Sequence, residues 1–541
     1  MAEAKKQNFL HGAAILAAGV VIMKILGAIY KIPLRNIIGE TGYGYFFAAY
    51  NIYNFFLTIS TAGLPVALSR MISAANTLNR PAQARRTFRV AMATLGALGL
   101  VFSLIMFLFP TEMAVLFVSR AVVSQCVLAL SPAVLLVCLT SAFRGFIQGS
   151  GNMSPTTVGQ VLEVLVKVIV GLALAVWFTR IGKSVPISAA GAIFGVTAGA
   201  LAALVYMGWC YLRQYRTPVT ADAAGDTPDS VGSTLWQFIR IGVPITIGAS
   251  VMSVFTLLDT KLINMQLPNV PGIGLALADE LYGSYSTMQT LYNLPAAFIT
   301  PMTIAVVPAI SAAVVRHAKE EVGAIAESSL RISAVVAMPM GIGLSVLAAP
   351  IVAVLYPGAN AVGPTILVYL GIASVFVCIA LVTNAILQAH GNETLPIISM
   401  IVGGVVKIGC NLLLVSRPEI NILGAAIGTI ACYAVICVLN CVFIARNMAV
   451  KPRFGRAFLR PLLSSAVMGA AAWAVYGLAA RVLHVGAGGS RIAMLAAMCA
   501  AIAVAVVVYL VMVIVSGSVT MEDMKLIPKG EKLAKLLHMK G

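Results

Sequence analysis

Long apolar segments separated by short polar segments recur along the whole chain. Runs of about 20 hydrophobic residues match the length that an α-helix needs to cross roughly 30 Å of hydrocarbon. Inside a bilayer every backbone N–H and C=O must be paired within its own segment, so these runs are expected to be helices. The pattern predicts fourteen spans, at 9–30, 44–64, 88–109, 121–143, 158–179, 187–211, 237–260, 284–308, 330–355, 362–388, 396–415, 421–444, 460–480 and 491–516.

Composition leads to the same fold class. Of the 541 residues, 60% are hydrophobic and only 10% are charged, whereas a soluble domain carries about 25% charged residues. We therefore predict an all-α, polytopic protein of the inner (cytoplasmic) membrane and not a soluble enzyme. Lys5 and Lys6 precede the first run, which is too long for the core of a signal peptide, so we expect an uncleaved first span.

The basic residues predict the orientation of the spans. With the N-terminus inside, the inner loops hold twenty-three lysines and arginines, the outer side holds eight, and five lie in or at the edge of spans. Short cytoplasmic loops carry this excess, so both termini are predicted to be cytoplasmic. The net charge of +18 is then explained by orientation and by attraction to anionic headgroups, and no nucleic-acid partner is expected.

An internal repeat relates spans one to six to spans seven to twelve. Gln148-Gly-Ser-Gly-Asn152 resembles Gln388-Ala-His-Gly-Asn392, and a lysine follows each Asn by fifteen residues, at an offset of 240. Tyr-Gly and Tyr-Asn pairs beginning at positions 43 and 53 recur at 282 and 292, at an offset of 239. The predicted organisation is an N-lobe at 1–212, a cytoplasmic linker at 213–236, a C-lobe at 237–446, two further spans within 447–516, and a cytoplasmic tail at 517–541.

A parallel repeat of six spans has a functional implication. Such repeats build transporters whose substrate site lies between the halves, which rock to give alternating access. The alternative is an old duplication that is kept for packing alone.

Five charged residues in or beside the spans are candidate substrate-binding residues of a central cavity. A charge near the middle of a span costs about 2.5–3.5 kcal/mol on insertion scales, so it usually faces a cavity or a partner. The alternatives are a snorkelling lysine in span one, an interfacial end of span seven and a basic anchor after span two. The five candidates are Lys24, Arg70, Asp259, Lys261 and Lys407.

Other motifs support these candidates. Glu163 and Lys167 are four residues apart, share a helix face and are predicted to form a supporting ion pair. Gly403 replaces the glutamate in the second half, so Lys407 has no carboxylate four residues before it. A loop motif on the cytoplasmic side contains Arg144, Gln148 and Asn152, and a glycine stripe at 191, 195 and 199 predicts a helix-packing face.

Several kinds of chemistry are not expected. The five histidines are scattered and make no metal set, and no Walker lysine loop indicates ATP binding. Only two acids are embedded, which argues against a membrane enzyme with paired carboxylates. No cofactor and no metal are therefore expected.

Ordered segments along nearly the whole chain carry a family resemblance. The chain resembles the polysaccharide-transporter branch of the multidrug/oligosaccharidyl-lipid/polysaccharide exporter superfamily, and within it the stage V sporulation protein B group, relatives of the lipid II flippase. The segments are Lys24-Ile-Leu-Gly27, Tyr30-Lys31-Ile-Pro33, Ala62-Gly-Leu-Pro65, Ala67-Leu-Ser69, Arg144-Gly-Phe-Ile-Gln148, Asn152-Met-Ser-Pro155 to Glu163, Leu294-Pro295, Val307-Pro308-Ala-Ile-Ser311 and Ile527-Pro528-Lys529-Gly530.

The resemblance implies a fold and a substrate. It implies fourteen helices in two six-helix lobes with two further helices beside a groove for a lipid tail, and movement of a polyprenyl-pyrophosphate-linked sugar to the outer leaflet. It also implies a pyrophosphate contact for Lys24. Some relatives bind sodium through acids on the seventh and eleventh helices; Asp259 matches the seventh, and Lys407 places an ammonium on the eleventh.

Three hypotheses stay open at this point. The first is a lipid-linked oligosaccharide flippase, whose partners are its lipid substrate, the bilayer and proteins of cell-wall synthesis. The second is a cation-coupled exporter of drugs or organic cations, which needs an acidic cavity. The third is a membrane enzyme or scaffold of envelope synthesis, which would need carboxylate clusters in the outer loops.

Overall fold

The computed structural model describes residues 2–214, 226–484 and 490–519. Within the first helix, the side chains of residues 2–18 and of Val20, Val21, Lys24, Ile25 and Ala28 lie outside the description. The predicted linker is thus described only at its two ends, and the predicted tail only as far as residue 519.

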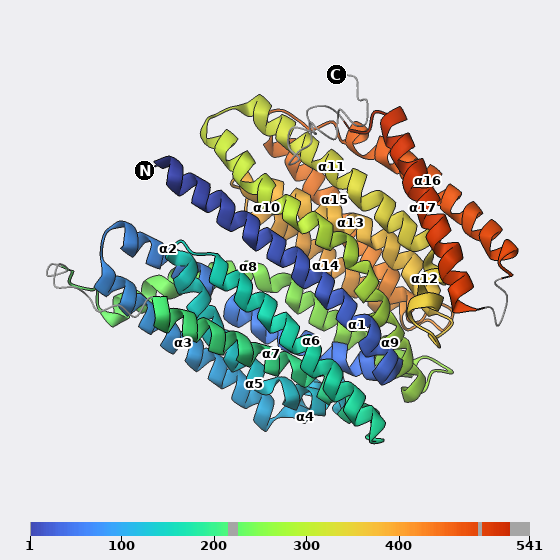
Figure 1. Cartoon of the computed structure of the whole chain (residues 1–541), viewed down its shortest axis with the longest axis horizontal. Coiled ribbons are helices and arrows are strands. Elements are labelled where there is room, and N and C mark those ends of the chain that lie inside the picture. Colours follow the sequence, from blue (N-terminus) through green and yellow to red (C-terminus); the bar gives the residue numbers. More distant parts are fainter. Residues whose placement is uncertain (1, 215–225, 485–489, 520–541) are drawn as a thin grey trace. The chain divides into compact units, whose positions relative to one another are not determined.

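The regular elements of the described part are all helices, which confirms the predicted all-α class. The chain divides into two compact units, Met1–Pro268 and Asn269–Gly541, and each is considered by itself as unit 1 and unit 2. The helices of unit 1 (Figure 1) are α1 (Ala2–Thr61), α2 (Leu64–Thr77), α3 (Pro81–Leu108), α4 (Pro110–Val118), η1 (Ala121–Val123), α5 (Ser124–Gly149), α6 (Ser154–Arg180), α7 (Val185–Gln214) and α8 (Val231–Gln266).

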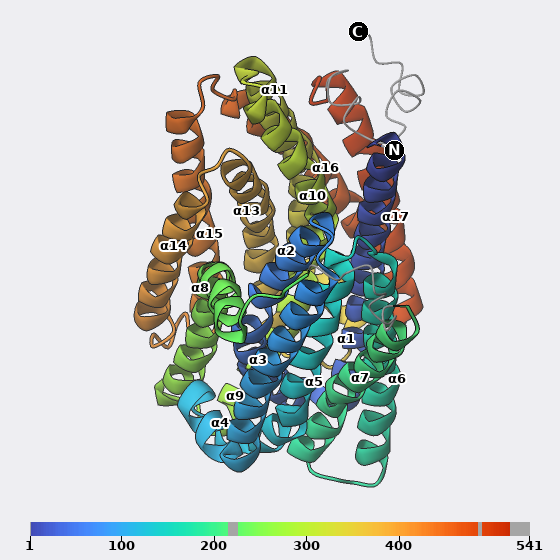
Figure 2. The same cartoon turned by 90° about the vertical axis from the view of Figure 1, so that its left-hand side faces the viewer.

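Unit 2 begins within a short turn, η3 (Leu267–Asn269), and contains the remaining helices. In Figure 2, α14 runs beside α15, and Figure 1 shows α16 beside α17. The helices of unit 2 are α9 (Leu275–Tyr292), α10 (Leu294–Val315), α11 (Lys319–Val346), α12 (Ala348–Leu355), α13 (Gly363–Ala389), α14 (Thr394–Leu414), α15 (Leu423–Asn447), α16 (Phe454–Val482) and α17 (Arg491–Val515).

Thirteen helical segments of the described residues are long and apolar enough to cross a membrane. They coincide with predicted spans two to fourteen. The predicted first span, 9–30, falls on the beginning of α1, where most side chains are not described. The polytopic membrane fold predicted from hydropathy is therefore confirmed.

The predicted loop between spans one and two is wrong, because α1 continues through it and breaks only at one residue. Gly39 has φ 76° and ψ 176°, a conformation that a glycine adopts without a Cβ clash. The chain turns back there, since the rings of Tyr30 and Phe46, sixteen residues apart, lie 6.3 Å from each other. Arg35 and Glu40 flank the break and form a buried ion pair of 2.7 Å.

Spans eight and nine differ most from the observed helices. Span eight is divided, because α9 ends at Tyr292 and Pro295 stands in the first turn of α10, where a missing N–H costs nothing. Span nine begins at Lys319 and not at 330, and α12 forms its last part. Hydropathy detects only the apolar part of a helix, so it did not predict the charged first turn of α11.

The helix order repeats with the offset seen in the sequence. The helices α3 to α7 begin 238 to 240 residues before α11 to α15, respectively. By this repeat α8 opens the second half, yet its contacts group it with unit 1. The predicted lobe limits stay a prediction, because the repeat and the contacts divide the chain at different places.

Candidate functional site

One turn of α1 brings together side chains from α6 and α8 at the depth of the predicted spans. The Asn51 amide donates to the Thr260 hydroxyl at 2.9 Å, and both side chains are buried. The Lys167 ammonium of α6 lies 5.9 Å from the centroid of the Tyr50 ring. Because Tyr50 and Asn51 are consecutive, Lys167 and Thr260 flank the same turn of α1, which we call the Tyr50–Asn51 turn.

Hydroxyl side chains spaced seven residues apart hold α8 against α1 and the start of α2. Residues seven apart occupy nearly the same face of a helix, so the three contacts form one row along α8. They are Gly63 N–H to Thr246 Oγ1 at 3.2 Å, Ser253 Oγ to Thr58 Oγ1 at 3.0 Å, and Asn51 Nδ2 to Thr260 Oγ1 at 2.9 Å. This row fixes the rotation of α8 about its axis and thereby the direction of the residues beside Thr260.

Asp259 and Lys261 stand on either side of Thr260. Asp259 is buried and Lys261 is half-buried. Neighbouring helical residues are rotated by about 100°, so the two side chains leave α8 in different directions. Within the described part of unit 1 the Lys261 ammonium makes no ion pair, and its charge is therefore available to an anion.

The predicted ion pair between Glu163 and Lys167 is replaced by another. The Arg144 guanidinium of α5 donates to Glu163 Oε2 at 2.5 Å. A planar guanidinium matches a carboxylate better than an ammonium does, and α5 presents it to the same face of α6. Lys167 instead lies over the Tyr50 ring, so a second half-buried ammonium of unit 1 has no carboxylate partner among the described residues.

The glycine stripe of α7 packs on the backbone of α6 beside these two charged residues. A Cβ at Gly195 would lie 2.6 Å from the Lys167 carbonyl oxygen and 2.7 Å from Gly171 Cα. A Cβ at Gly199 would clash with the Glu163 carbonyl oxygen. The predicted helix-packing face is confirmed, and it places Glu163 and Lys167.

A valine at position 195 should separate α6 from α7. Overpacking a close helix contact costs typically 1–3 kcal/mol, and here the clash is with backbone, which cannot rotate away. Gly195→Val should unfold at lower temperature in detergent and lose transport. Gly208→Val is the control, because a Cβ there has its nearest neighbour at 4.0 Å; equal losses in both variants would contradict the packing role.

Lys24 lies on the first arm of α1, and its side chain is outside the description. The arm follows α6, since Gly19 abuts Thr157 and the Tyr30 hydroxyl abuts Gly171. The backbone of Lys24 lies between these two contacts along α1. Its predicted role in a cavity stays a prediction.

The remaining predicted residues of unit 1 have other surroundings. Arg70 is exposed on α2, and no contact in the described part joins it to the other candidates. Gln148 and Asn152 close the end of α5: the Gly151 N–H donates to the Gln148 carbonyl at 2.9 Å, and the Asn152 N–H to the Ile147 carbonyl at 3.3 Å. Gln148 and Asn152 thus end a helix here.

The same turn recurs after α13, which explains the repeated motif. Gly151 and Gly391 have φ of 84° and 91°, values that favour glycine. The Gly391 N–H donates to the Gln388 carbonyl at 3.1 Å, as in the first half. The strongest sequence match between the halves is therefore a helix C-cap.

Lys407 of unit 2 has different neighbours from its counterpart Lys167. A Cβ at Gly403, the counterpart of Glu163, would lie 2.9 Å from the Cys432 carbonyl oxygen. A carboxylate therefore has no room there. Asn384, the counterpart of Arg144, accepts from the Asn440 amide at 2.7 Å. Lys407 is half-buried on α14, and its grouping with Lys24 and Lys261 stays a prediction.

Comparison with known families identifies the chain. Residues 9–314, more than half of this chain, match the model of a protein family that is described as 'Polysaccharide biosynthesis protein'. The chain belongs to this polysaccharide biosynthesis protein family.

Two curated proteins of Bacillus subtilis (strain 168) resemble this family member. Stage V sporulation protein B is 24% identical over 449 residues, which cover 82% of this chain and 85% of that protein. Lipid II flippase MurJ is 24% identical over 450 residues, which cover 78% and 81% of the two chains.

Two solved structures share the fold of this family member. The lipid II flippase MurJ in an inward closed conformation matches with a TM-score of 0.69 at 13% identity, over 93% of this chain and 98% of that one. An inward-facing multidrug resistance MATE transporter of the MOP superfamily matches with a TM-score of 0.63 at 16% identity, over 84% and 98%. The polysaccharide biosynthesis family member thus has the multi-pass helical fold that these two transporters share, and the resemblance given by its sequence is confirmed.

Three residues that arrange the site were not predicted from the sequence. Tyr50, Asn51 and Thr260 carry no charge, so a search for intramembrane charges passed over them. A signal existed, because an asparagine inside an apolar span usually bonds to another helix. The described residues contain no group of three or more His, Cys, Asp or Glu side chains arranged to hold a metal ion.

Proposed function

We propose that this protein is a flippase that moves a polyprenyl-pyrophosphate-linked saccharide across the bacterial cytoplasmic membrane, a lipid II-like precursor or another envelope oligosaccharide. One observation carries the proposal: two half-buried ammonium groups, Lys167 over the Tyr50 ring and Lys261 next to Thr260 in the chain, have no carboxylate partner in the described part of unit 1. A cation inside the membrane without a counter-ion has an unfavourable free energy, which a bound anion reduces.

The chemistry of the proposed substrate suits this arrangement. A pyrophosphate offers several charged oxygens, and lysine ammonium groups bind such oxygens as point charges. Lys24 and Lys407 are proposed to add two further cations to the same cavity. The names of two relatives, Lipid II flippase MurJ and stage V sporulation protein B, support a cell-envelope substrate.

The driving force is proposed to be the membrane potential. A potential of 100 mV contributes about 2.3 kcal/mol for each charge that crosses it. An inside-negative potential favours outward movement of an anion and inward return of the empty cationic site. No cofactor is then required, and the Lys407 ammonium is proposed to stand where some relatives hold sodium. Both termini are proposed to be cytoplasmic, in line with the basic inner loops.

Complementation tests the proposal. The chain is expressed in a strain depleted of its lipid II flippase, and precursor facing each leaflet is measured. Restored growth with loss of the inward-facing pool is expected. Continued accumulation of inward-facing precursor, with the protein inserted at a normal level, would contradict a lipid II-like substrate. A drug panel on a deletion strain separates the alternative, because an organic-cation exporter would change drug resistance and leave the precursor unchanged.

A further inference from the structure

Three helices of unit 1 form an apolar groove. Figures 1 and 2 both show α7 between α5 and α6, and α7 packs against each of them. The groove exists because small residues line it between larger ones. The small residues are Ala129, Ala190 and Gly191, and the larger ones include Leu174, Phe178 and Phe194. The groove offers about 400 Å³ of space. An apolar cavity of about 150 Å³ already holds benzene, so a segment of a hydrocarbon chain fits here.

The groove begins at one membrane surface and runs inward. Its three helices are among those long and apolar enough to cross a membrane. Gln125 and Ile187 line it in the first turns of α5 and α7, and Phe194 lines it seven residues further along α7. Seven helical residues extend over about 10 Å, whereas the hydrocarbon of one leaflet is about 15 Å thick. Of the described residues that line the groove, only Gln125 is polar, so the groove suits the upper part of a lipid tail.

An aromatic pair marks the level of the lipid headgroups at this end of the groove. The rings of Trp177 and Phe178 are stacked, with their centroids 5.1 Å apart. Phe178 lines the groove, and Trp177 is 56% exposed. Exposed tryptophans of membrane proteins concentrate where hydrocarbon meets the headgroups. A lipid tail in the groove would therefore have its headgroup just beyond the end of α6.

A rigid turn holds two cations at that position. The Lys183 N–H donates to the Phe178 carbonyl at 3.0 Å. The Gly182 N–H donates to the Thr179 carbonyl at 3.2 Å, and Gly182 has a left-handed φ of 69°. These two bonds form a Schellman motif, which closes α6. Arg180 is the last residue of α6, so the motif fixes the backbone of Arg180 and Lys183 within one turn of the groove.

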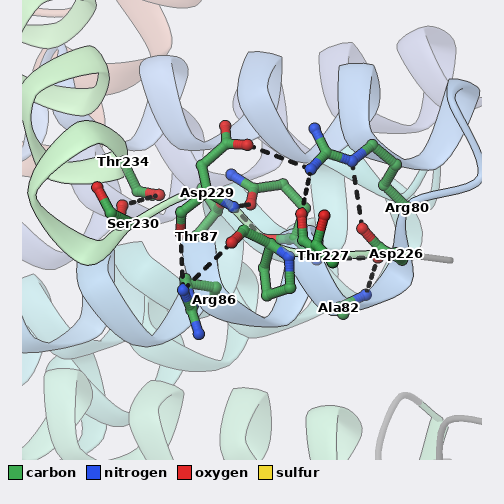
Figure 3. A network of polar contacts seen from close by, with 11 residues as sticks. Arg80, Ala82, Arg86, Thr87, Asp226, Thr227, Asp229, Ser230 and Thr234 are labelled. Atoms are coloured by element: carbon green, nitrogen blue, oxygen red, sulfur yellow. Dashed lines mark hydrogen bonds and ion pairs between the residues drawn. The ribbon is translucent and has the colours of Figure 1, made fainter. Parts of the chain in front are cut away.

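These two cations have no partner inside the described part of the chain. Arg180 and Lys183 are exposed and make no ion pair or side-chain hydrogen bond among the described residues. The other end of unit 1 is different (Figure 3). There Arg80 donates to Asp226 Oδ1 and to Asp229 Oδ1, each at 3.2 Å. The chain neutralises Arg80 itself, whereas the charges of Arg180 and Lys183 are available to an anion from outside.

We propose that an anionic phospholipid binds at this groove, with one acyl chain between α5, α6 and α7 and its phosphate beside Arg180 and Lys183. A lipid tail is as apolar as the groove, so moving it out of the bilayer gives no hydrophobic gain. Selectivity then comes from the headgroup. A basic residue near the surface gives roughly a fivefold preference for anionic lipid, and two give roughly thirtyfold. The inference does not rest on the proposed function, because the transport site uses none of these residues.

The fluorescence of Trp177 measures the binding. The purified full chain is placed in lipid nanodiscs, and phosphatidylglycerol with brominated acyl chains is added to unlabelled phosphatidylcholine in rising mole fraction. Bromine quenches a tryptophan that it contacts. Brominated phosphatidylcholine in unlabelled phosphatidylglycerol is the reverse experiment. The difference between the natural chain and Trp177→Phe isolates the signal of Trp177.

Two variants and two matched controls test the site. Arg180→Ala with Lys183→Ala removes the charges, and Ala190→Phe fills the groove. Arg89→Ala removes an exposed cation of α3, and Ala173→Phe adds the same ring at an exposed position of α6 that does not line the groove. The unfolding temperature of every variant is recorded. The two charge changes lie at the end of α6 and in the loop after it, so they decide the question if Ala190→Phe does not fold.

The proposal expects half-maximal quenching of Trp177 at a roughly thirtyfold lower mole fraction of brominated phosphatidylglycerol than of brominated phosphatidylcholine. The preference should disappear without Arg180 and Lys183, weaken in Ala190→Phe and stay in both controls. Equal quenching by the two lipids, or a preference that persists without the two charges, overturns the proposal. Displacement of phosphatidylglycerol by an equal amount of polyprenyl phosphate would assign the groove to a polyprenyl lipid and overturn it as well.

Discussion

Cells that depend on this protein should stop growing when Lys261 is replaced by alanine. A hydrogen bond to a charged group contributes about 1.5–3 kcal/mol, and the Lys261 ammonium has no other charge to satisfy in the described part of unit 1. The loss predicts transport that is slower by roughly ten- to a hundredfold. Lys24→Ala and Lys407→Ala should each have an effect of the same order, and their combination should abolish outward movement of the precursor.

Three further measurements make this prediction specific. Lys261→Arg should retain function, because it keeps the cation at the same place on α8. Arg89→Ala is the matched control, since Arg89 is an exposed basic residue of unit 1 outside the Tyr50–Asn51 turn. If Lys261→Ala, Lys24→Ala and Lys407→Ala all supported normal growth with a normal leaflet distribution of the precursor, the cationic site would be refuted.

Removal of the Glu40 carboxylate should give the largest loss of stability. The Arg35 and Glu40 side chains are only 4% and 6% exposed, so Glu40→Ala leaves a buried guanidinium without its ion partner. Such a loss costs about 3–5 kcal/mol, whereas replacing both partners with apolar residues of similar size is often neutral. The thermal unfolding midpoint in detergent should fall sharply in Glu40→Ala and recover in Arg35→Met with Glu40→Leu.

An exposed pair supplies the comparison for this measurement. Arg316 and Glu321 lie 2.9 Å apart with side chains 61% and 44% exposed, and a surface ion pair contributes only about 0–1 kcal/mol. Glu321→Ala should therefore barely move the midpoint. A fall in Glu321→Ala as large as that in Glu40→Ala would show that burial is not the reason for the effect.

Hydropathy predicted the membrane fold because a spanning helix needs about 20 consecutive apolar residues, and an average over a window of that length detects them. The same average gives no information on the backbone conformation or the contacts of a single residue. It could not show that the chain reverses at the single residue Gly39, between two helical arms, nor that Arg35 is buried against Glu40.

The partners of charged residues were harder to predict than their positions. Spacing along α6 favoured Lys167 as the partner of Glu163, but the partner is Arg144 from another helix. A helical wheel shows neighbours on the same helix only. The packing of α5 against α6, which brings Arg144 to Glu163, is a tertiary contact that spacing along one helix cannot predict. The repeat was predictable, since duplicated turns need the same glycines at 151 and 391.

The row of hydroxyls on α8 has a consequence for the lengths that this helix can have. Thr246, Ser253 and Thr260 meet α1 and α2 only because seven residues complete almost two turns. Insertion of one codon between 246 and 260 would rotate everything beyond it by about 100° and turn Lys261 away from its present direction. Natural variants of this gene should therefore tolerate many substitutions in that interval but no change in its length.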